Sequence, residues 1–574
     1  MKSNKILKMI SIACVLAILT SMTACSGDSS GKDTSDTASN TSDTGNMNDT
    51  GDTGAETENN GKSGLITITT VVSLDDTMQA MVGTNPDVAT NNNWYNGYKE
   101  DLGIEVVNVW SVPATQYDDK LNAQIAADDL PDVFKVTADQ LKTLVENGMV
   151  MDMTQVFSDY ASDFTLEMME ADDQVGLSQA TYDGKLMALP CAQGNTGIMP
   201  VMWIRRDWMD KLGYEAPKTM KELEALALAF VTEDPDENGA DDTYGIALSN
   251  DLYSSDLCDL TGVFAGFEAY PEGWIEQDGS IVSGFIQPEV KNALETMSVW
   301  YQEGIFDPEF IAKDSSKVAE DIISGKVGIS FGSHWNAFWP FQDAYNYDME
   351  ADWVPYALPT ETGELAQIMV NGSAVDFYAV NVKCENPEAV VEMFNYFYAK
   401  DCALSPDYDS TFHITSSLQL SNPEQSFVWA VIKTNYAEQN TFIHRGLMAY
   451  FNGDETQIEN PWVSDNVINV EKFQEDPIGN SMHWSDNMWS GPEGAFSIVN
   501  SYIDNKQTLQ NLYILGNTEG MSQYKVTLDQ LTEETYTKII SGSLDISSFD
   551  DYVTQWKALG GDEITAEVNE AISN

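Results

Sequence analysis

The stretch LITITTVV (65–72) and the stretch NNNWYNGYKEDLGIEVVNVW (91–110) together indicate the fold class. The first is rich in β-branched residues in alternation, which favours a strand. Residues 91–102 are typical of a helix, Gly103 ends it, and IEVVNVW (104–110) returns to strand. A strand, a helix and a second strand in this order are typical of an α/β unit.

Further along the chain, several helices carry their own start signals. Thr137 with Gln140 and Thr219 with Glu222 each form a capping-box pattern, and the second precedes the periodic run LEALALAF. Pro288 and Pro387 open two other predicted helices, and Thr527 is expected to begin a helix that ends near Gly542. Continued alternation of strands and helices predicts an α/β fold with largely parallel sheets.

The N-terminus predicts export. Lysines precede a short apolar run, residues 9–19, which suits a signal-peptide core and is too short for a mature membrane span. The run ends in Met-Thr-Ala-Cys25, which resembles the bacterial lipobox, so residues 1–24 are expected to be removed and Cys25 to be lipidated (for example palmitoylated). An ordinary signal peptide that contains a cysteine is the alternative. Residues 25–64 are acidic, rich in Ser, Thr, Gly and Asp, and almost free of large apolar side chains, which predicts a disordered tether.

The remainder, about 65–574, is too long for one hydrophobic core and fits two lobes. The chain has 91 acidic and 28 basic residues and a formal net charge of −63. Such a surface repels phosphate backbones, so we exclude nucleic-acid binding. Outside the cell, one or two disulfides could form among Cys191, Cys258, Cys384 and Cys402, and Cys384 with Cys402 is one conceivable pair.

Signatures of catalysis are weak. The four histidines are isolated, with no paired-histidine zinc spacing. Gly328-Ile-Ser-Phe-Gly332 matches G-x-S-x-G, but the residues that follow Ser330 suggest an aromatic loop rather than the helix that a nucleophile elbow needs. Carboxylate pairs suited to glycoside hydrolysis stay open, because a chain this acidic contains every spacing.

Tryptophans stand in polar turns. Trp335 and Trp339 lie in GSHWNAFWP, Trp274 in YPEGWIEQDG, and Trp484 in HWSDNMWSGPEG. An indole face packs against the C–H face of a pyranose, and neighbouring polar groups bond its hydroxyls. These residues are therefore candidate carbohydrate contacts, and the alternative for each is structural packing.

The loop DPDENGADDTYG (234–245) places side-chain oxygens at alternate positions before a glycine. Calcium prefers six to eight oxygen ligands, and such a spacing lets a short loop wrap one ion. The candidate ligands are Asp234, Asp236, Asn238, the Ala240 carbonyl and Asp242. Gly245 stands where an EF-hand has its bidentate glutamate, and an acidic turn without an ion is the alternative.

Linked motifs carry a family resemblance. GKLMALP (184–190) followed by MWIRRDWMDKLGYEAPKTMKELEAL (202–226) resembles the second-lobe entry of bacterial family-1 solute-binding proteins. The same holds for YDDKLNAQIAADDLPDVFKV (117–136), YQEGIFDPEF (301–310), GKVGISFGSHW (325–335) and VPYALPTETG (354–363). The C-terminal residues 537–569 resemble the large lipoprotein subgroup that serves carbohydrate ABC importers of Gram-positive bacteria.

The resemblance implies an α/β, two-lobed fold of the periplasmic-binding-protein type, with crossing hinge strands and a central ligand cleft. It implies a first lobe of about 65–188 plus 360–425 and a second of about 189–359 plus 426–574. It implies a monomer without catalysis, held at the extracellular face of the cytoplasmic membrane by the Cys25 lipid, that delivers an oligosaccharide to ABC permease subunits. A surface-anchored glycan-degrading enzyme and a sensor partner of a signalling receptor are the alternatives.

Site residues follow from the same resemblance. The matching position implies that Trp335 stacks on sugar, with Trp339 adjoining it. The segment from Asp132 to Asp139 is implied to reach the cleft from the first lobe, and Asn93 and Trp94 are implied to lie near the cleft mouth.

Overall fold

The computed structural model describes residues 64–573, apart from 193, 195–198, 254–256, 278 and 414–419. The predicted signal peptide, Cys25 and nearly all of the predicted tether therefore lie outside the described residues. Among the helices that are described, none combines the length and the apolar character needed to cross a membrane.

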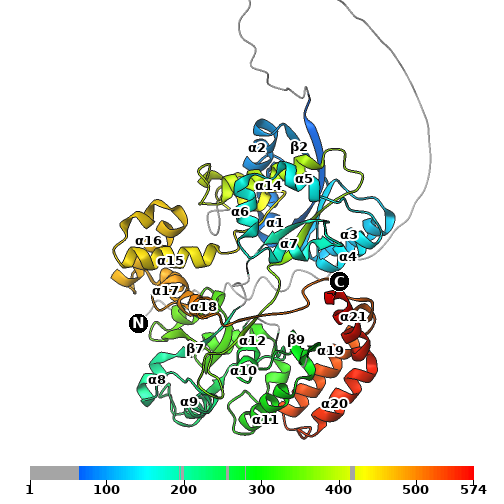
Figure 1. Ribbon diagram of the computed structural model, residues 1–574. Helices are drawn as coiled ribbons and strands as arrows, with labels where there is room; N and C mark the ends of the chain where they lie inside the picture. The colour runs from blue at the N-terminus through cyan, green and yellow to red at the C-terminus, as the bar shows by residue number, and fades with distance from the viewer. Residues whose placement is uncertain are drawn as a thin grey trace, which may run out of the picture. The chain divides into compact units, whose positions relative to one another are not determined.

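Strands form two main sheets and several two-stranded pairs (Figure 1). The strands are β1 (Ile66–Leu74), β2 (Ile104–Pro113), β3 (Val133–Val136), β4 (Thr181–Tyr182), β5 (Lys185–Leu186), β6 (Leu189–Ala192), β7 (Pro200–Arg205), β8 (Tyr244–Ile246), β9 (Trp274–Gln277), β10 (Ser280–Ser283), β11 (Val327–Ser333), β12 (Trp353–Tyr356), β13 (Ile368–Val370), β14 (Ala374–Val380) and β15 (Thr508–Gln510). The first sheet has the order β3-β14-β6 and the second has the order β12-β7-β11-β8.

Helices separate most of these strands. They are α1 (Asp76–Thr84), α2 (Asn93–Asp101), α3 (Tyr117–Ala127), α4 (Ala138–Glu146), α5 (Thr154–Tyr160), α6 (Asp163–Glu170), α7 (Val175–Gln179), α8 (Arg206–Leu212), α9 (Met220–Thr232), α10 (Thr261–Gly266), α11 (Pro288–Gln302), α12 (Ser315–Ile323), α13 (Phe341–Tyr347), α14 (Pro387–Asp401), α15 (Gln439–Phe451), α16 (Pro461–Glu475), α17 (Trp484–Ser490), α18 (Ala495–Asp504), α19 (Glu519–Ile540), α20 (Ser548–Trp556) and α21 (Asp562–Ser573). The predicted α/β class is confirmed.

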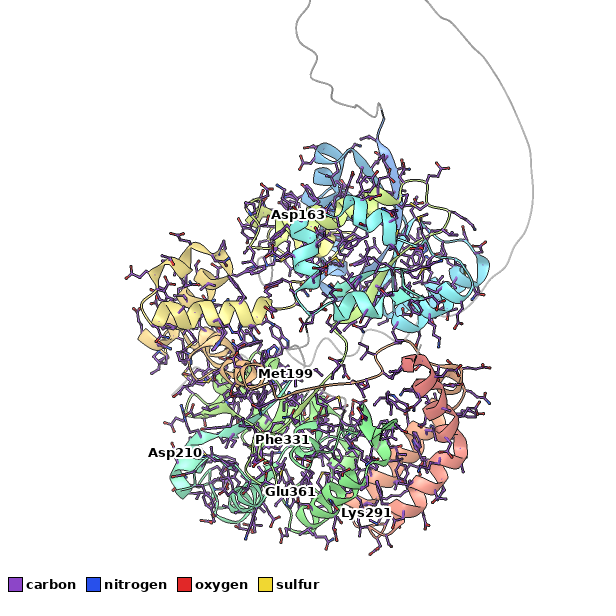
Figure 2. The ribbon with its side chains drawn as sticks, viewed as in Figure 1. Asp163, Met199, Asp210, Lys291, Phe331 and Glu361 are labelled. Atoms are coloured by element: carbon purple, nitrogen blue, oxygen red, sulfur yellow. The ribbon has the colours of Figure 1, made fainter. Side chains whose placement is uncertain are left out.

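The second sheet is buried on both faces. Every residue of β7 and of β11 is buried, which is why PVMWIR (200–205) is nearly continuously apolar rather than alternating. Trp203 and Trp353 are fully buried and both pack against Phe341 of α13. Phe331 lies in the interior of this part of the molecule (Figure 2).

The prediction of largely parallel sheets was wrong. β14 runs antiparallel to both β3 and β6, and β7 runs antiparallel to both β11 and β12. The cause is the chain's passage between the sheets. β6 leaves the first sheet at Ala192, which pairs with Ala374 where β14 enters it, and β7 enters the second sheet at Pro200, which pairs with Ser333 where β11 ends. A strand that enters where its neighbour leaves must run antiparallel to it.

Further segments pass between the regions of the two sheets. Residues 371–373 join β13 to β14, and β13 pairs in parallel with β15. β6 itself bonds to β14, so the first sheet extends past the predicted lobe boundary at 188, and the division into lobes stays a prediction.

Local signals predicted most helix starts. Both capping boxes are present, at Thr137–Gln140 and Thr219–Glu222, and Pro288 and Pro387 begin α11 and α14. The start at Thr527 was wrong: α19 begins at Glu519, where the Thr518 side chain accepts from the Met521 amide. Cys191, Cys384 and Cys402 are buried free thiols, so the conceivable 384–402 disulfide is not formed.

Candidate functional site

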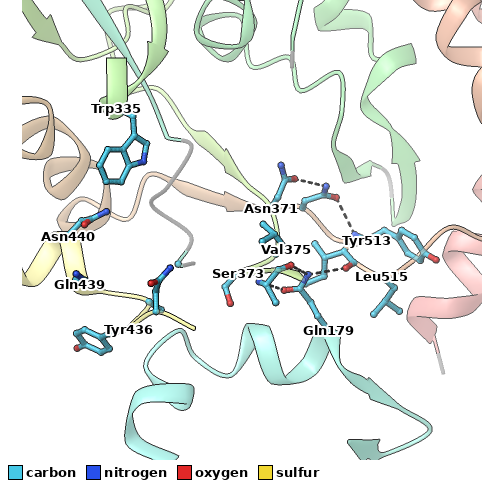
Figure 3. Close-up of a pocket in the computed structure, with 17 residues that line it drawn as sticks. Gln179, Trp335, Asn371, Ser373, Val375, Tyr436, Gln439, Asn440, Tyr513 and Leu515 are labelled. Atoms are coloured by element: carbon cyan, nitrogen blue, oxygen red, sulfur yellow. Dashed lines mark hydrogen bonds between the residues drawn. The ribbon is translucent and has the colours of Figure 1, made fainter. Parts of the chain in front are cut away.

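A cavity of about 730 Å³ lies where three connecting segments meet (Figure 3). The segments are 371–375 between β13 and β14, 435–440 leading into α15, and 511–515 after β15. Gln179, Gly194 and Trp335 complete its lining. This volume is in the range of pockets that hold small-molecule ligands.

One wall is an amide network. Asn511 donates through Nδ2 to Asn371 Oδ1 over 2.9 Å, and its own Oδ1 accepts from the Tyr513 amide over 3.2 Å. The same Oδ1 accepts from the Trp274 amide over 2.9 Å, and the Asn511 amide donates to the Val370 carbonyl. These bonds hold Asn511 in place, while Asn371 is exposed beside the cavity.

A second amide ties the connecting segments together. Gln179 accepts from the Ala374 amide over 2.8 Å and donates to the carbonyls of Ala374 and Ile514 over 3.2 and 3.3 Å. Its side chain lies so close to Gly372 that an added Cβ there would fall 2.0 Å from Nε2. Glycine at 372 therefore lets the backbone approach Gln179, which fixes the segment that leads into β14.

Trp335 supplies an aromatic face. It lies in the single 3-10 turn η5 (His334–Ala337) directly after β11. Its ring stacks on Trp489 with centroids 5.4 Å apart and planes at 19°, and Trp489 Nε1 donates to His334 Nδ1 over 3.0 Å. One side of the indole is thus supported by Trp489, and the side chain is still 44% exposed. This is the arrangement of a fixed stacking platform.

Two tyrosines, Tyr436 and Tyr513, also line the cavity. Burial, with Glu438 nearby, raises the pKa of Tyr436 to about 12, and burial, with Asp139 and Glu567 nearby, raises the pKa of Tyr513 to about 12. Both hydroxyls therefore keep their protons at neutral pH. Tyr513 donates to the Gly516 carbonyl over 2.7 Å, and Tyr436 donates to Glu438 over 3.4 Å.

The predicted tryptophans separate into different environments. Trp335 lines the cavity, whereas Trp339 is 46% exposed but is outside the lining. Trp274 lies behind the amide wall, edge-on to Tyr513 with centroids 6.4 Å apart. Trp484 is 1% exposed and stacks on Tyr345, so its place in the ligand set was an error of sequence reasoning: the polar turn folds as helix α17 and turns the ring inward.

The site residues that were predicted for the first lobe also lie outside the cavity lining. Trp94 is fully buried and stacks on Phe397, because its helix presents that face to α14. Asn93 donates to the Thr411 carbonyl, and Asp132 accepts from the Thr69 amide and hydroxyl, which ties β1 to the start of β3. Asp139 accepts from the Asn517 amide and side chain and lines a separate shallow pocket.

Sequence reasoning missed the amides. The lining includes Gln179, Asn371, Asn435, Gln439, Asn440 and Asn511. A signal existed in NYAEQN (435–440), a polar run with one aromatic between apolar segments, but nothing in the sequence alone places residues 179, 371, 435 and 511 together.

The acidic loop follows α9 and leads into β8, which begins at Tyr244. Asn238 Nδ2 donates to Asp236 over 2.7 Å and to Asp242 over 3.0 Å, and the Gly239 amide donates to Asp234. Burial, followed by the nearby Asp234 and Asp242, raises the pKa of Asp236. Among the described residues, no group of three or more His, Cys, Asp or Glu side chains is arranged to hold a metal ion.

Ser330 of the G-x-S-x-G pattern is fully buried inside strand β11, and a 3-10 turn follows that strand. This is not the strand-to-helix elbow of a serine nucleophile.

An α/β architecture with a polar cavity lined by segments 371–375, 435–440 and 511–515 suits a protein that binds a small solute. The model of the bacterial extracellular solute-binding protein family matches residues 72–401. The chain belongs to this family. It is therefore a binding protein, and the glycan-degrading enzyme that the sequence left open is excluded.

Curated relatives agree in class. The chain is 25% identical over 484 residues, 82% of its length and 86% of the relative's, to the polygalacturonan/rhamnogalacturonan-binding protein YtcQ of Bacillus subtilis. It is 26% identical over 232 residues, 40% of its length and 44% of the relative's, to the lipoprotein LipO of the same organism.

Solved structures share the fold. A solute-binding protein from Bifidobacterium longum infantis, described as binding HMO and associated with an ABC transporter, has a TM-score of 0.58 at 16% identity, over 89% of this chain and 99% of that one. An EF-hand mutant of the Streptococcus pneumoniae ABC-transporter substrate-binding protein FusA, in complex with fructo-nystose, has a TM-score of 0.55 at 13% identity, over 88% and 99%. These likenesses confirm the predicted solute-binding fold.

Proposed function

We propose that this protein captures an oligosaccharide in the 371–375/435–440/511–515 cavity and delivers it to the permease subunits of an ABC importer. The observation that carries the proposal is the combination of an exposed, supported indole at Trp335 with an amide-rich wall. Indole faces suit the apolar faces of sugar rings, and side-chain amides both donate to and accept from hydroxyl groups. The names of three similar proteins, which mention polygalacturonan/rhamnogalacturonan, HMO and fructooligosaccharide, support the same class of ligand.

The test is a thermal-shift screen of the chain against a panel of oligosaccharides. A ligand at 100 times its dissociation constant adds about 2.7 kcal/mol to the stability of the bound protein. We expect one class of glycan to raise Tm, with the glycan recovered uncut by chromatography. A panel in which no member raises Tm would refute oligosaccharide binding.

The proposal includes an anchored, two-lobed molecule that acts as a monomer. Cys25 would carry the lipid, and 25–64 would tether the binding domain to the extracellular face of the membrane; the lipobox-like sequence and the likeness to a lipoprotein support this. Residues 65–188 plus 360–425 and 189–359 plus 426–574 would form lobes that close on the glycan, as hinged binding proteins do.

A structural calcium ion at 234–245 is a further part of the proposal. In the loop, the Asp236 and Asp242 carboxylates lie close enough together to accept from one Asn238 amide group, over 2.7 and 3.0 Å. A cation would relieve this crowding of negative charge. Oxygens of Asp234, Asp236, Asn238 and Asp242, with the Ala240 carbonyl, are the hard ligands that Ca²⁺ prefers, and binding would draw together carboxylates that the structure does not hold in a metal-binding arrangement. The ion would pin the connection from α9 to β8 and take no part in sugar binding.

A further inference from the structure

The cavity lining, all of it within the described residues, carries no ionisable group other than two tyrosines. Its polar members are asparagine, glutamine, serine and tyrosine side chains, and the rest are glycine, apolar residues and Trp335. The tyrosines are neutral at neutral pH, since a tyrosine hydroxyl ordinarily has a pKa of about 10 and burial raises that of each to about 12.

We propose that the cavity selects an uncharged oligosaccharide and rejects glycans made of uronic acids; this rests on the proposed function. A neutral sugar offers hydroxyls, each a donor and an acceptor, and amides match both roles. A uronate carries a carboxylate at each residue, which accepts only and loses its hydration on entering the cavity. In this lining only neutral N–H and O–H donors meet the carboxylate, with no cation and no acidic side chain to anchor a bridging divalent ion, so we expect that loss to be compensated only in part.

Two lysines near the cavity are already engaged. Lys135 and Lys433 line a separate pocket of about 230 Å³ that also contains Asp75. Lys135 Nζ lies 2.6 Å from the Asp376 carboxylate, and Lys433 Nζ donates to the Val428 carbonyl over 3.0 Å. A uronate that reached these lysines would have to displace an ion pair or a backbone bond.

Helix α15 does not give the cavity a net positive charge either. Its amino-terminal end, at Gln439 and Asn440, brings partial positive charge to the cavity. Glu438 occupies the N-cap position, and Tyr436 donates to its carboxylate, so a full negative charge stands beside that end. The formal net charge of −63 acts in the same direction, but its reach is only about 8 Å at physiological salt, so the uncharged lining decides.

This inference departs from the name of the relative YtcQ, which specifies polygalacturonan, a polymer of uronic acid. At 25% identity, the name of one chain does not fix the ligand of the other. Oligomers of galacturonate, the ligand that the name YtcQ would suggest for this chain, therefore test the inference directly.

The experiment is calorimetry of the chain with matched glycans. Oligogalacturonates are compared with the same oligomers after reduction of their carboxyl groups, beside neutral oligosaccharides from the thermal-shift panel. We expect a neutral glycan to bind and each oligogalacturonate to bind at least thirtyfold more weakly than the best neutral glycan. If an oligogalacturonate binds as tightly as the best neutral glycan, selection for neutral sugars is refuted and oligosaccharide binding stands. If no glycan binds, both proposals fail.

A charge placed in the lining sharpens the test. Gln439→Lys adds a cation at the cavity, and Gln155→Lys adds the same charge at an exposed position of helix α5 that is not part of the lining. We expect the first variant alone to gain at least tenfold in oligogalacturonate affinity, with the gain lost at high salt. Equal behaviour of the two variants would show that the charge of the lining does not set specificity.

Discussion

Replacing Trp335 by alanine removes a half-exposed indole that lines the cavity and stacks on Trp489. A tryptophan side chain presents roughly 200 Å² when exposed, so a ring that is 44% exposed offers roughly 90 Å². One sugar ring would cover about half of this area and lose a similar area of its own. Removing about 90 Å² from water at about 25 cal/mol per Å² is worth about 2 kcal/mol. We expect Trp335→Ala to raise the dissociation constant roughly thirtyfold, and at least tenfold.

Trp339→Ala is the matched control. Trp339 is 46% exposed, almost the same as Trp335, and lies four residues away, but it does not line the cavity. Calorimetry of both variants with the glycan found by screening, and melting curves to show that both fold, give the comparison. An unchanged dissociation constant for Trp335→Ala, or equal losses in the two variants, would remove Trp335 from the site.

Three other predictions follow from the same structure. Chelation of calcium should lower Tm while sugar specificity stays the same, and Asp236→Asn should abolish the effect; a melting curve that millimolar calcium does not change would mean that the loop is only a turn. Small-angle scattering should show a smaller radius of gyration with glycan bound, and equal radii would indicate a rigid site. Burial opposes protonation of His413, but the hydrogen bond and charge of Asp401, 2.6 Å away, and the charge of Asp465 together raise its pKa above the ordinary 6.5. The folded state therefore binds this proton more tightly, so the stabilisation is complete below about pH 6.5 and is lost as pH rises through the raised pKa. The Tm difference between the protein and His413→Gln should be larger at pH 5.5 than at pH 9; equal differences would contradict it.

Local signals in the sequence predicted local structure well. The boxes at Thr137 and Thr219 form as expected because a capping box satisfies backbone donors within four residues of itself. The helix start predicted at Thr527 was wrong because Thr518, nine residues earlier, caps the same helix. A threonine inside a long helix causes little disruption. The prediction of parallel strands was wrong for another reason. Strand direction is set by where the chain crosses between the sheets, and the periodicity of the sequence does not encode this.

The cavity residues also divide into those that the sequence could predict and those that it could not. Trp335 could be predicted because a tryptophan in a polar turn directly after a buried strand has few ways to be covered. Trp484 stood in a similar turn, yet the turn folds as α17 and buries the ring against Tyr345. Gln179, Asn371 and Asn511 are far apart in the chain, and only the meeting of the connecting segments brings them to one cavity.

The central claim is that the connecting segments build a glycan site, and the most direct test is a crystal structure of the chain with a glycan that raises its Tm. The account predicts a sugar ring lying against the open face of Trp335, with hydroxyls within hydrogen-bond distance of amides from at least two of the segments 371–375, 435–440 and 511–515. A glycan bound elsewhere, with this cavity holding only water, would contradict it.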